Sequence, residues 1–519
     1  MNKNNINGSV ANTLLTHFNQ GCEQFSQHLA FTCNGQSTTY QDLERDSRYF
    51  ATYLQTHPEL KRGDRLAVQL PNCAAYPVIA WGALRAGLVV VNVNPLYTEK
   101  ELLHIYRDSG AKALVLLGSS VASVMPLLAQ TGLLSVVYLP NVQPDADVVK
   151  ENCQPYQDAL KLGSCQSFMP VALEAHDMAL LQYTGGTTGL SKGAILTHQN
   201  LISAAQGFWE ATNVFEPGNE IFVGPLPLYH VYAFVAHIVV GVMYGVTSIL
   251  ISDPRDLGGF SQALQETKFS LFVGINTLFN ALCHDEGFKQ LDFSGLKFTL
   301  SGGMALDLTI AKRWLALTGC EINEGYGLTE SAAGVIVNRG QHDRRLGSVG
   351  KPVAGIEIKI TDKEGHVLGA GEKGELHIRG KQVMRGYWQD LNASNEVLKE
   401  GWLATGDIAT VDEDGFVYIV DRIKDMIIVS GFNVYPVEIE QVVNGLDGVV
   451  ECAAMARKSD DTGEAVHLYV VLHDSQPTSA QILAHCRANL AAYKVPKVIK
   501  VIDQLPKSPV GKILKRLLE

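Results

Sequence analysis

The 519-residue chain lacks the sequence features of several large protein classes. Its nine cysteines are scattered, odd in number and never spaced as Cys-x-x-Cys, which favours neither a disulfide framework nor a zinc site. Basic residues are not in excess, because 42 Lys and Arg stand against 53 Asp and Glu, and the resulting net charge of -11 disfavours nonspecific binding of nucleic acid. No repeat or low-complexity tract is visible. These absences indicate a globular, non-repetitive protein of a reducing compartment.

The chain also lacks a convincing signal peptide or membrane span. Its first residues, Met1–Asn5, are polar, so export is not expected and a cytoplasmic location is predicted. The stretch 231–251 contains no Asp, Glu, Lys or Arg and reaches the length of a spanning helix. A histidine and two glycines interrupt it, however, and its β-branched end, 246–251, is typical of a buried strand. We therefore expect a buried helix followed by a buried strand.

The N-terminal part alternates strand and helix signals. With 46% apolar residues, the chain is too long for one ordinary core. Residues 66–70, 73–85 and 88–93 predict a strand, an apolar helix and a second strand, and a helix closed by a capping box and a final glycine is expected over 98–110. Apolar periodicity fades over 140–170, which predicts a crossing of the surface between lobes. The expected architecture is α/β, with parallel sheets covered by helices.

The C-terminal part has a different pattern, with short strand signals separated by glycine turns. A hairpin signal at Asp414 and Gly415 precedes a strand, and a junction follows at 421–425. Beyond it, the pattern predicts helices over 436–444 and 479–490 and strands over 449–456, 466–472 and 498–502. This indicates a large multi-lobed domain over 1–422 and a small α+β domain over 423–519. Residues 485–519 carry a local charge of +6, from eight Lys and Arg against two acidic residues, typical of either a solvated or a phosphate-facing surface.

The run from Tyr183 to Ala194 is rich in glycine and threonine and contains one lysine. Glycines let backbone N–H groups approach an anion, hydroxyls add donors and a lysine adds charge, so the run predicts a polyphosphate loop and ATP as its ligand. Its end reads Ser191, Lys192, Gly193, which is not the Gly-Lys-Ser/Thr end of a P-loop. A flexible surface turn is the alternative interpretation.

Two further motifs contain side chains suited to binding a nucleotide. Gly325–Glu330 places an aromatic ring, a hydroxyl and a carboxylate beside glycines, suited to a base, a phosphate and Mg²⁺. Taken alone, the motif has a default structural interpretation, in which Tyr326 is a core aromatic or Glu330 is a carboxylate at a helix start. Near the end of the chain, Pro509 and Gly511 predict a loop that presents Lys512 at its tip, from where it can reach another domain.

Together these motifs resemble those of the adenylate-forming (ANL) superfamily, in the same order and across the whole chain. The shared stretches are the loop after Tyr183, Tyr326–Glu330, Thr405–Asp407, Asp421–Arg422 and Pro506–Lys512. Residues 421–436 and 274–280 are more specifically similar to bacterial long-chain-fatty-acid–CoA ligases. The resemblance implies that a fatty acid attacks ATP to form an acyl-AMP and pyrophosphate, and that the thiol of coenzyme A then displaces AMP.

The resemblance also implies roles for individual residues. Catalysis and Mg²⁺ binding fall on Glu330 and Thr184, with Lys512 and His230 as further catalytic groups. Phe234, Gly274 and Asn276 are expected at the acyl tunnel, with Phe234 as its gate. Lys424 is expected as the hinge of a rotating small domain that exchanges Lys512 for Gly431, beside which pantetheine would pass. The contacts expected for the nucleotide and coenzyme A are Thr184, Gly185, Gly186, Thr187, Thr188, Gly189, Lys192, Gly302, Gly303, Glu324, Gly325, Tyr326, Gly327, Thr329, Asp407, Arg422, Lys424, Gly431 and Lys512.

Other functions remain open at this point. The acid could be of medium or short chain length or aromatic, or the acyl group could pass to a carrier protein instead of coenzyme A. A noncatalytic lipid- or nucleotide-binding protein is disfavoured, because Lys192, Glu330 and Lys512 are all present. Peripheral contact with the inner face of a membrane and a homodimer are also left open.

Overall fold

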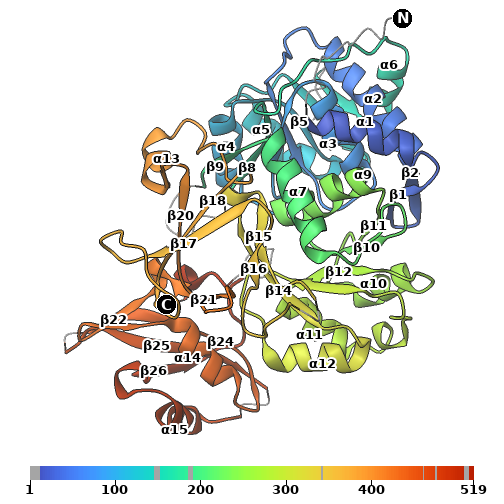
Figure 1. Ribbon diagram of the computed structural model, residues 1–519. Helices are drawn as coiled ribbons and strands as arrows, with labels where there is room; N and C mark the ends of the chain where they lie inside the picture. Colours follow the sequence, from blue (N-terminus) through green and yellow to red (C-terminus); the bar gives the residue numbers. More distant parts are fainter. Residues whose placement is uncertain are drawn as a thin grey trace, which may run out of the picture.

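The computed structural model describes residues 12–144, 152–184, 191–340, 343–459, 461–473, 476–507 and 513–518. Within them, two mainly parallel sheets form the large N-terminal part (Figure 1). The seven-stranded sheet has the order β7-β6-β5-β3-β4-β8-β9, with β3 (Arg65–Gln69), β4 (Val89–Asn92), β5 (Ala111–Leu117), β6 (Ser135–Leu139), β7 (Cys153–Pro155), β8 (Met178–Tyr183) and β9 (Gly193–Thr197). The predicted α/β class is confirmed.

The second sheet has nine strands in the order β16-β15-β14-β13-β12-β10-β11-β1-β2. Its strands are β1 (Leu29–Cys33), β2 (Gln36–Thr39), β10 (Ile221–Gly224), β11 (Thr247–Leu250), β12 (Leu271–Gly274), β13 (Phe298–Ser301), β14 (Ile322–Leu328), β15 (Ala333–Val337) and β16 (Lys351–Pro352). The strands from β11 to β14 run parallel, whereas β15 and β16 turn back antiparallel.

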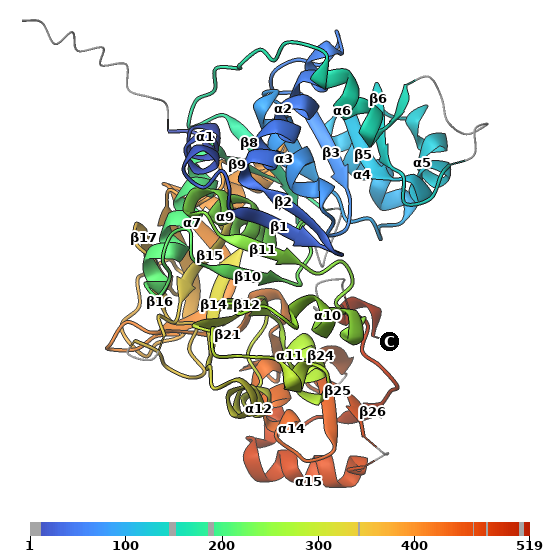
Figure 2. The ribbon, with the colours of Figure 1, turned by 90° about the vertical axis from the view of Figure 1, so that its right-hand side faces the viewer.

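Helices lie between the two sheets and on both outer faces (Figure 2). The middle layer shares one hydrophobic core with both sheets and contains α1 (Leu14–Gln24), α2 (Tyr40–Thr56), α3 (Ala75–Arg85), α7 (His198–Thr212) and α9 (Val240–Tyr244). The helices α4 (Glu99–Ser109) and α5 (Val121–Leu128) cover the seven-stranded sheet, and α10 (Leu257–Leu264), α11 (Asn276–His284) and α12 (Leu308–Thr318) cover the nine-stranded one. Because α3 lies between sheets, every residue from Tyr76 to Arg85 is buried, which explains its apolar sequence.

Asn72 joins the two sheets just before α3. Its buried side-chain amide donates to the backbone oxygens of Gly224, Leu226 and Ile251, at 3.2, 3.0 and 3.0 Å, and its carbonyl accepts from the Leu228 N–H at 2.8 Å. A polar side chain buried at this point is stable because each of its groups is bonded. These bonds fix the chain that leads from β10 towards the site described below.

Most predicted elements have the expected type. The capping box of Thr98 and Glu101 and the left-handed Gly110 bound α4 as predicted. The stretch 231–251 forms α8 (Val231–Ala233), the π-helix η2 (Phe234–Val239), α9 and then β11, all within the core. Among the described residues, no helix is both long and apolar enough to cross a membrane.

The prediction for 140–170 was wrong in part. Within it, β7 extends the edge of the seven-stranded sheet and α6 (Tyr156–Ser164) packs against α2. The helix buries only Tyr156, Ala159 and Gly163, so its apolar periodicity is weak in the sequence. Gly163 is required at this contact, because a Cβ there would lie 1.9 Å from the backbone oxygen of Tyr49.

Two smaller sheets complete the chain. The first contains β17 (Ile356–Thr361), β18 (Gly374–Gly380), β19 (Leu398–Lys399), β20 (Trp402–Val411) and β21 (Val417–Arg422), with α13 (Leu391–Val397) beside it. The second lies at the C-terminal end and contains β22 (Ile427–Val429), β23 (Phe432–Val434), β24 (Val449–Ser459), β25 (Gly463–Leu472) and β26 (Val498–Val501), packed with α14 (Pro436–Asn444) and α15 (Ser479–Asn489). This C-terminal α+β unit has a core of its own.

Candidate active site

A cavity of about 1750 Å³ opens where parallel strands of both sheets end. Its wall takes residues from the carboxyl ends of β4, β8, β10, β12, β13 and β14, the position where open α/β sheets bind ligands. Lining residues from these ends include Asn94, Thr184, His230, Ile275, Gly302 and Glu330. The volume exceeds the usual 300–1,000 Å³ or so of a pocket for one small molecule. The cavity therefore has room for more than one substrate.

The glycine-rich run connects β8 to β9, which pair antiparallel. The Thr184 N–H donates to the Lys192 oxygen at 2.9 Å and closes the loop at its base. His104 on α4 adds a second anchor, since its Nε2 lies 2.9 Å from the Ser191 oxygen. Thr184, Ser191 and His104 line the cavity. The loop residues between these anchors lie outside the described part of the chain, namely Gly185, Gly186, Thr187, Thr188 and Gly189.

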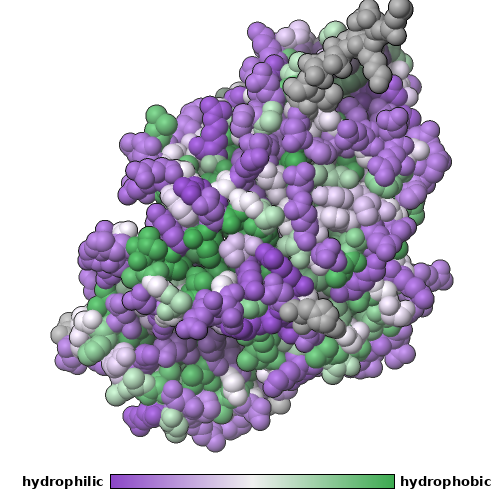
Figure 3. Space-filling view, in the orientation of Figure 1, coloured by the Kyte–Doolittle hydropathy of each residue, from purple (hydrophilic) through white to green (hydrophobic). Residues whose placement is uncertain are grey.

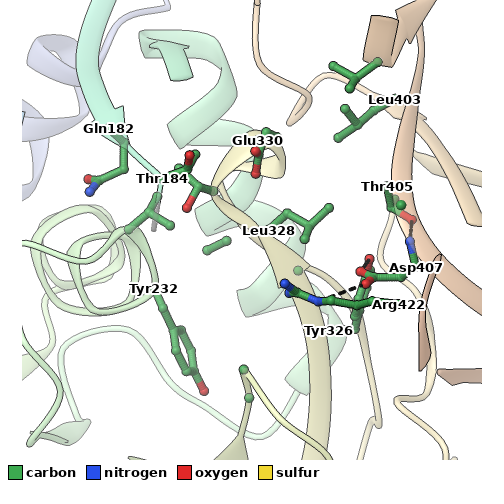
Figure 4. A pocket seen from close by; sticks show the side chains of 18 of the residues that line it. Gln182, Thr184, Tyr232, Tyr326, Leu328, Glu330, Leu403, Thr405, Asp407 and Arg422 are labelled. Atoms are coloured by element: carbon green, nitrogen blue, oxygen red, sulfur yellow. Dashed lines mark hydrogen bonds and ion pairs between the residues drawn. The ribbon is translucent and has the colours of Figure 1, made fainter. Parts of the chain in front are cut away.

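Glu330 lies in the turn η4 (Thr329–Ser331), directly after β14. It lines the cavity together with Thr329 and Thr184, and in Figure 4 the Glu330 and Thr184 side chains both project into this space. Its Oε1 accepts a hydrogen bond of 2.8 Å from the Tyr387 hydroxyl. The Lys192 ammonium lies 5.2 Å from the centre of the same tyrosine ring. Lys192 is not itself among the lining residues.

A polar cluster lies on another wall of the cavity, between β14, β20 and β21. The buried Asp407 accepts a 2.5 Å hydrogen bond from the Tyr326 hydroxyl and lies 3.3 Å from Nε of Arg422 (Figure 4). Thr405 fixes the Asp407 backbone through a 3.1 Å bond to its N–H. Burial, and then the Asp407 charge, raise the pKa of Tyr326, so its hydroxyl remains a donor. Gly325 and Gly327 line the cavity on either side of Tyr326.

Gly302 and Gly303 follow β13 and face the same space. A Cβ at Gly302 would lie 3.3 Å from the Tyr232 ring, and Gly303 has a φ of +86°, which favours glycine. The backbone is therefore exposed to a ligand at this point without an intervening side chain.

Glu324 lies in β14 but is not among the lining residues. Its two carboxyl oxygens accept from the Leu306 and Gly347 N–H groups, each at 3.2 Å. Burial raises the pKa of this carboxyl to about 7. Glu324 thus connects two loops behind the cavity wall, and the structure does not bring it to the position of a nucleotide contact.

The residues expected around the acyl tunnel separate into two groups. His230 lines the cavity, and its Nδ1 accepts from the Tyr232 N–H at 3.4 Å. Phe234 is only 1% exposed and does not line the cavity; its neighbours Val235 and Ala236 do.

Gly274 and Asn276 also lie outside the lining. A Cβ at Gly274 would meet the Phe279 ring at 2.7 Å, so the glycine serves packing. Asn276 donates to the Ala305 oxygen at 2.7 Å and accepts from the Asp307 N–H at 3.2 Å, so it shapes the loop after β13.

An apolar section of the cavity lies between α7, the helices after His230 and β15. Its lining residues are Ala204, Phe208, Val231, Val235, Ala236, Leu300, Ala333, Ile336, Val337 and Val353. A second apolar surface is visible on the outside, on the left of Figure 3 at the level of β17 and β20.

The C-terminal unit also contributes to the cavity wall. Lys424, in the turn η5 (Ile423–Asp425), lines it together with Lys507, Leu514 and Arg516. A bridge between Lys507 and Ile513 closes the loop that carries Lys512, which itself lies outside the described residues. Gly431 forms the turn between β22 and β23 with a φ of +84° and does not line the cavity.

Part of the positive charge near the C-terminus is compensated inside the same unit. Lys494 pairs with Glu438 at 2.6 Å, Lys507 with Glu451 at 2.6 Å and Lys515 with Glu440 at 2.8 Å. The local excess of +6 is therefore not a continuous basic surface, although Lys507 still reaches the cavity.

Sequence reasoning missed Tyr387 and His104. Both line the cavity, and both contact predicted site residues or their neighbours. A signal existed for Tyr387, because a tyrosine directly after a glycine is compatible with a turn that presents a ring. No local pattern distinguished His104 from other polar residues of an amphipathic helix.

Comparisons with known proteins match nearly the whole chain. The family described as AMP-binding enzyme matches residues 18–388, and the family described as AMP-binding enzyme C-terminal domain matches residues 438–512. The long-chain-fatty-acid–CoA ligase of Salmonella typhimurium (strain LT2) is 42% identical over 536 aligned residues, which cover 99% of this chain and 95% of the relative.

Solved structures show the same architecture. ATP-bound MatB from Rhodopseudomonas palustris aligns with a TM-score of 0.88 at 28% identity and covers 98% of each chain. The anthranilate CoA ligase AuaEII in complex with anthranoyl-AMP has a TM-score of 0.88 at 25% identity and covers 98% of this chain and 96% of its own.

The buried Glu324 predicts an unusual pH dependence of stability. Its pKa is raised in the folded protein, so its contribution is present below the ordinary value near 4.5 and is lost as the pH rises through about 7. Replacement by neutral glutamine removes this dependence. We expect the stability of the wild type relative to Glu324→Gln to fall by about 3 kcal/mol between pH 4.5 and pH 8. Denaturant unfolding at both pH values measures this difference. The exposed Glu23→Gln is the control, and an equal difference at both pH values would contradict the assignment.

Proposed function

This chain belongs to the AMP-binding enzymes, and from that premise we propose that it joins a long-chain fatty acid to coenzyme A at the expense of ATP, with AMP and pyrophosphate as products. The observation that carries the proposal is a single cavity that joins the polar residues at the strand ends to an apolar section lined by residues of α7, η2 and β15. The 42% identity to a long-chain-fatty-acid–CoA ligase over 99% of the chain supports the same assignment.

In this proposal, ATP occupies the polar section. The loop between β8 and β9, with Thr184 at its base and Thr329 opposite, holds the phosphates through N–H and hydroxyl donors. The Tyr326 ring stacks on adenine against the open backbone of Gly302 and Gly303. Asp407 accepts from the ribose hydroxyls, and Arg422 keeps its carboxylate in place.

Glu330 and Thr184 fit a magnesium site. Mg²⁺ is commonly held by one or two carboxylates, with substrate phosphates and waters completing its shell. No cluster of three or more His, Cys, Asp or Glu suited to a metal occurs in the described residues, which agrees with such a sparse site rather than a protein cage. When bound, the ion would neutralise charge on the phosphate oxygens.

The reaction proceeds in two displacements. An oxygen of the fatty acid carboxylate attacks the α-phosphorus of ATP, the bond to the β-phosphate oxygen breaks, and pyrophosphate leaves. The thiol sulfur of coenzyme A then attacks the acyl carbonyl, its proton is lost, and AMP leaves. Lys512 compensates the negative charge that spreads over the α-phosphate, and His230 lies beside the acid. Positioning and charge compensation supply most of the catalysis.

We assign residues 1–422 and 423–519 to two domains that turn relative to each other at Lys424. In the orientation described here, Lys507 and Leu514 line the cavity, so the base of the Lys512 loop faces the site of the first step. Gly431 lies outside the lining, and a rotation would bring its turn to the cavity for the second step. Loop exchange of this kind lets one cavity serve two reactions.

Production of AMP with a panel of carboxylic acids tests the function. The rate should depend on both ATP and coenzyme A and should rise with chain length, because each buried methylene adds about 0.8 kcal/mol of binding. AMP and acyl-CoA should appear in equal amounts, as measured by chromatography. A maximum with medium-chain or aromatic acids would redirect the proposal to those substrates, and release of ADP and orthophosphate would contradict it. Acyl-AMP formation with no transfer to coenzyme A would indicate delivery to a carrier protein.

Lys512→Ala should separate the two steps. Loss of one preorganised charged donor in the first step lowers its rate by roughly 10²–10³. Thioester formation from supplied acyl-AMP should continue near the wild-type rate, because the rotated small domain carries Lys512 away from the cavity. Pyrophosphate exchange measures the first step, and acyl-CoA formation from acyl-AMP measures the second. An equal loss in both assays would refute the division of roles.

Ala236→Phe should shorten the accepted acid. A ring at this position would fill part of the apolar section, since Ala236 lines the cavity beside Val235. We expect kcat/KM for long-chain acids to fall roughly 5- to 150-fold more than kcat/KM for acids of six to eight carbons, because overpacking costs about 1–3 kcal/mol when the chain must share the space. The ratio of kcat/KM values across the panel is the measurement. Retained activity with short acids is the internal control for folding, and an unchanged ratio would place the acyl chain elsewhere.

A further inference from the structure

The segment 384–388 joins parts of the site that are far apart in the sequence. The Ile195 N–H of β9 donates to the Gly386 oxygen at 2.9 Å, and the Trp388 N–H donates to the Gly193 oxygen at 2.7 Å. At its other end, the Met384 N–H donates to the backbone oxygen of Glu330 at 2.8 Å. The segment therefore pairs with the strand that leaves the glycine-rich loop and also holds the turn that carries Glu330.

Tyr387 projects from this segment into the cavity and contacts two charged groups. Its hydroxyl donates to Glu330 at 2.8 Å, and its ring faces the Lys192 ammonium at 5.2 Å. Its own backbone N–H donates to the Ser394 hydroxyl at 2.8 Å, so the start of the side chain is fixed.

A packing role does not account for this arrangement. A phenylalanine would fill the same volume, but it would leave Glu330 without the bond that orients its carboxylate. The hydroxyl bonds one of the two carboxyl oxygens, Oε1, of a side chain that lines the cavity. The ring faces the lysine that follows the glycine-rich loop, a favourable contact between a cation and a π-system.

We propose that Tyr387 is a positioning residue for the triphosphate and its Mg²⁺, which orients Glu330 through its hydroxyl and Lys192 through its ring. The inference rests on the proposed function only for the identity of the ligand. Groups that hold a metal-binding carboxylate in place typically contribute 10–100-fold to metal affinity, as an order of magnitude. Tyr387 thus links the glycine-rich loop, on one side of the phosphates, to the Glu330 carboxylate on the other side.

Two substitutions separate the hydroxyl from the ring. Tyr387→Phe keeps the ring under Lys192 and removes the bond to Glu330, whereas Tyr387→Leu removes both. Binding of ATP, measured by calorimetry without a fatty acid, is titrated against Mg²⁺ concentration for each variant. For Tyr387→Phe we expect a rise of roughly tenfold in the Mg²⁺ concentration at half-saturation, with metal-free ATP binding unchanged. For Tyr387→Leu we expect weaker metal-free ATP binding as well.

Tyr418→Phe is the matched control. The Tyr418 hydroxyl also donates to a carboxylate, that of Asp412 at 3.1 Å, but on the hairpin of β20 and β21 and outside the cavity lining. Its removal should leave the Mg²⁺ dependence at the wild-type value. In a Glu330→Gln background, Tyr387→Phe should cause no further change, because the two groups act as one unit.

Each result decides the inference. A Tyr387→Phe titration that matches Tyr418→Phe overturns it, and so does an equal loss of metal-free and metal-dependent ATP binding, which would indicate general distortion. The inference is also overturned if Tyr387→Phe still raises the Mg²⁺ concentration at half-saturation tenfold in the Glu330→Gln background. Failure of the proposed function is distinguishable, since a wild-type protein that forms no AMP with any acid could still show the Mg²⁺ shift in Tyr387→Phe.

Discussion

The antiparallel pairing of β8 with β9 is the constraint on which the site depends. It brings the Thr184 N–H within 2.9 Å of the Lys192 backbone oxygen. The glycine-rich loop between these residues therefore has two fixed ends. The same strand β9 then receives the segment of Tyr387 on its other edge. A loop that must approach phosphates closely cannot carry bulky side chains, so its geometry has to come from the strands that bound it.

Some polar side chains lie at the ends of strands and others lie within the strands, and the two positions have different roles. Residues just beyond the ends of β8, β13 and β14 face the cavity, whereas Glu324, deeper in β14, connects loops behind it. Glu324 lies two residues before Tyr326 in the sequence, and the family resemblance implied a nucleotide contact there. Depth along a strand decides whether a side chain reaches the carboxyl edge, and depth depends on where pairing with β13 begins, at Thr299 and Ile322.

Local patterns predicted the elements well and tertiary contacts poorly. The helix over 436–444 and the capping box before α4 depend on neighbouring residues, so they could be predicted from the sequence. Tyr387 and Glu330 are separated by 57 positions, and their contact depends on the pairing of the Tyr387 segment with β9 and on the bond from the Met384 N–H to the Glu330 backbone oxygen. Gly274 and Asn276 similarly carry a family resemblance, but their observed contacts concern packing and loop shape.

The π-helix from Phe234 to Val239 has one residue more in its turn than an α-helix would have. Within this widened turn, Val235 and Ala236 line the ligand space, whereas Phe234 is buried. Loss of a single residue from this turn would restore ordinary winding and leave the faces of α9 unchanged, because the widened turn is what absorbs the extra residue. One heritable step could thus alter the lining of the acyl compartment at this turn alone, while the rest of the helix and the nucleotide half stay as they are.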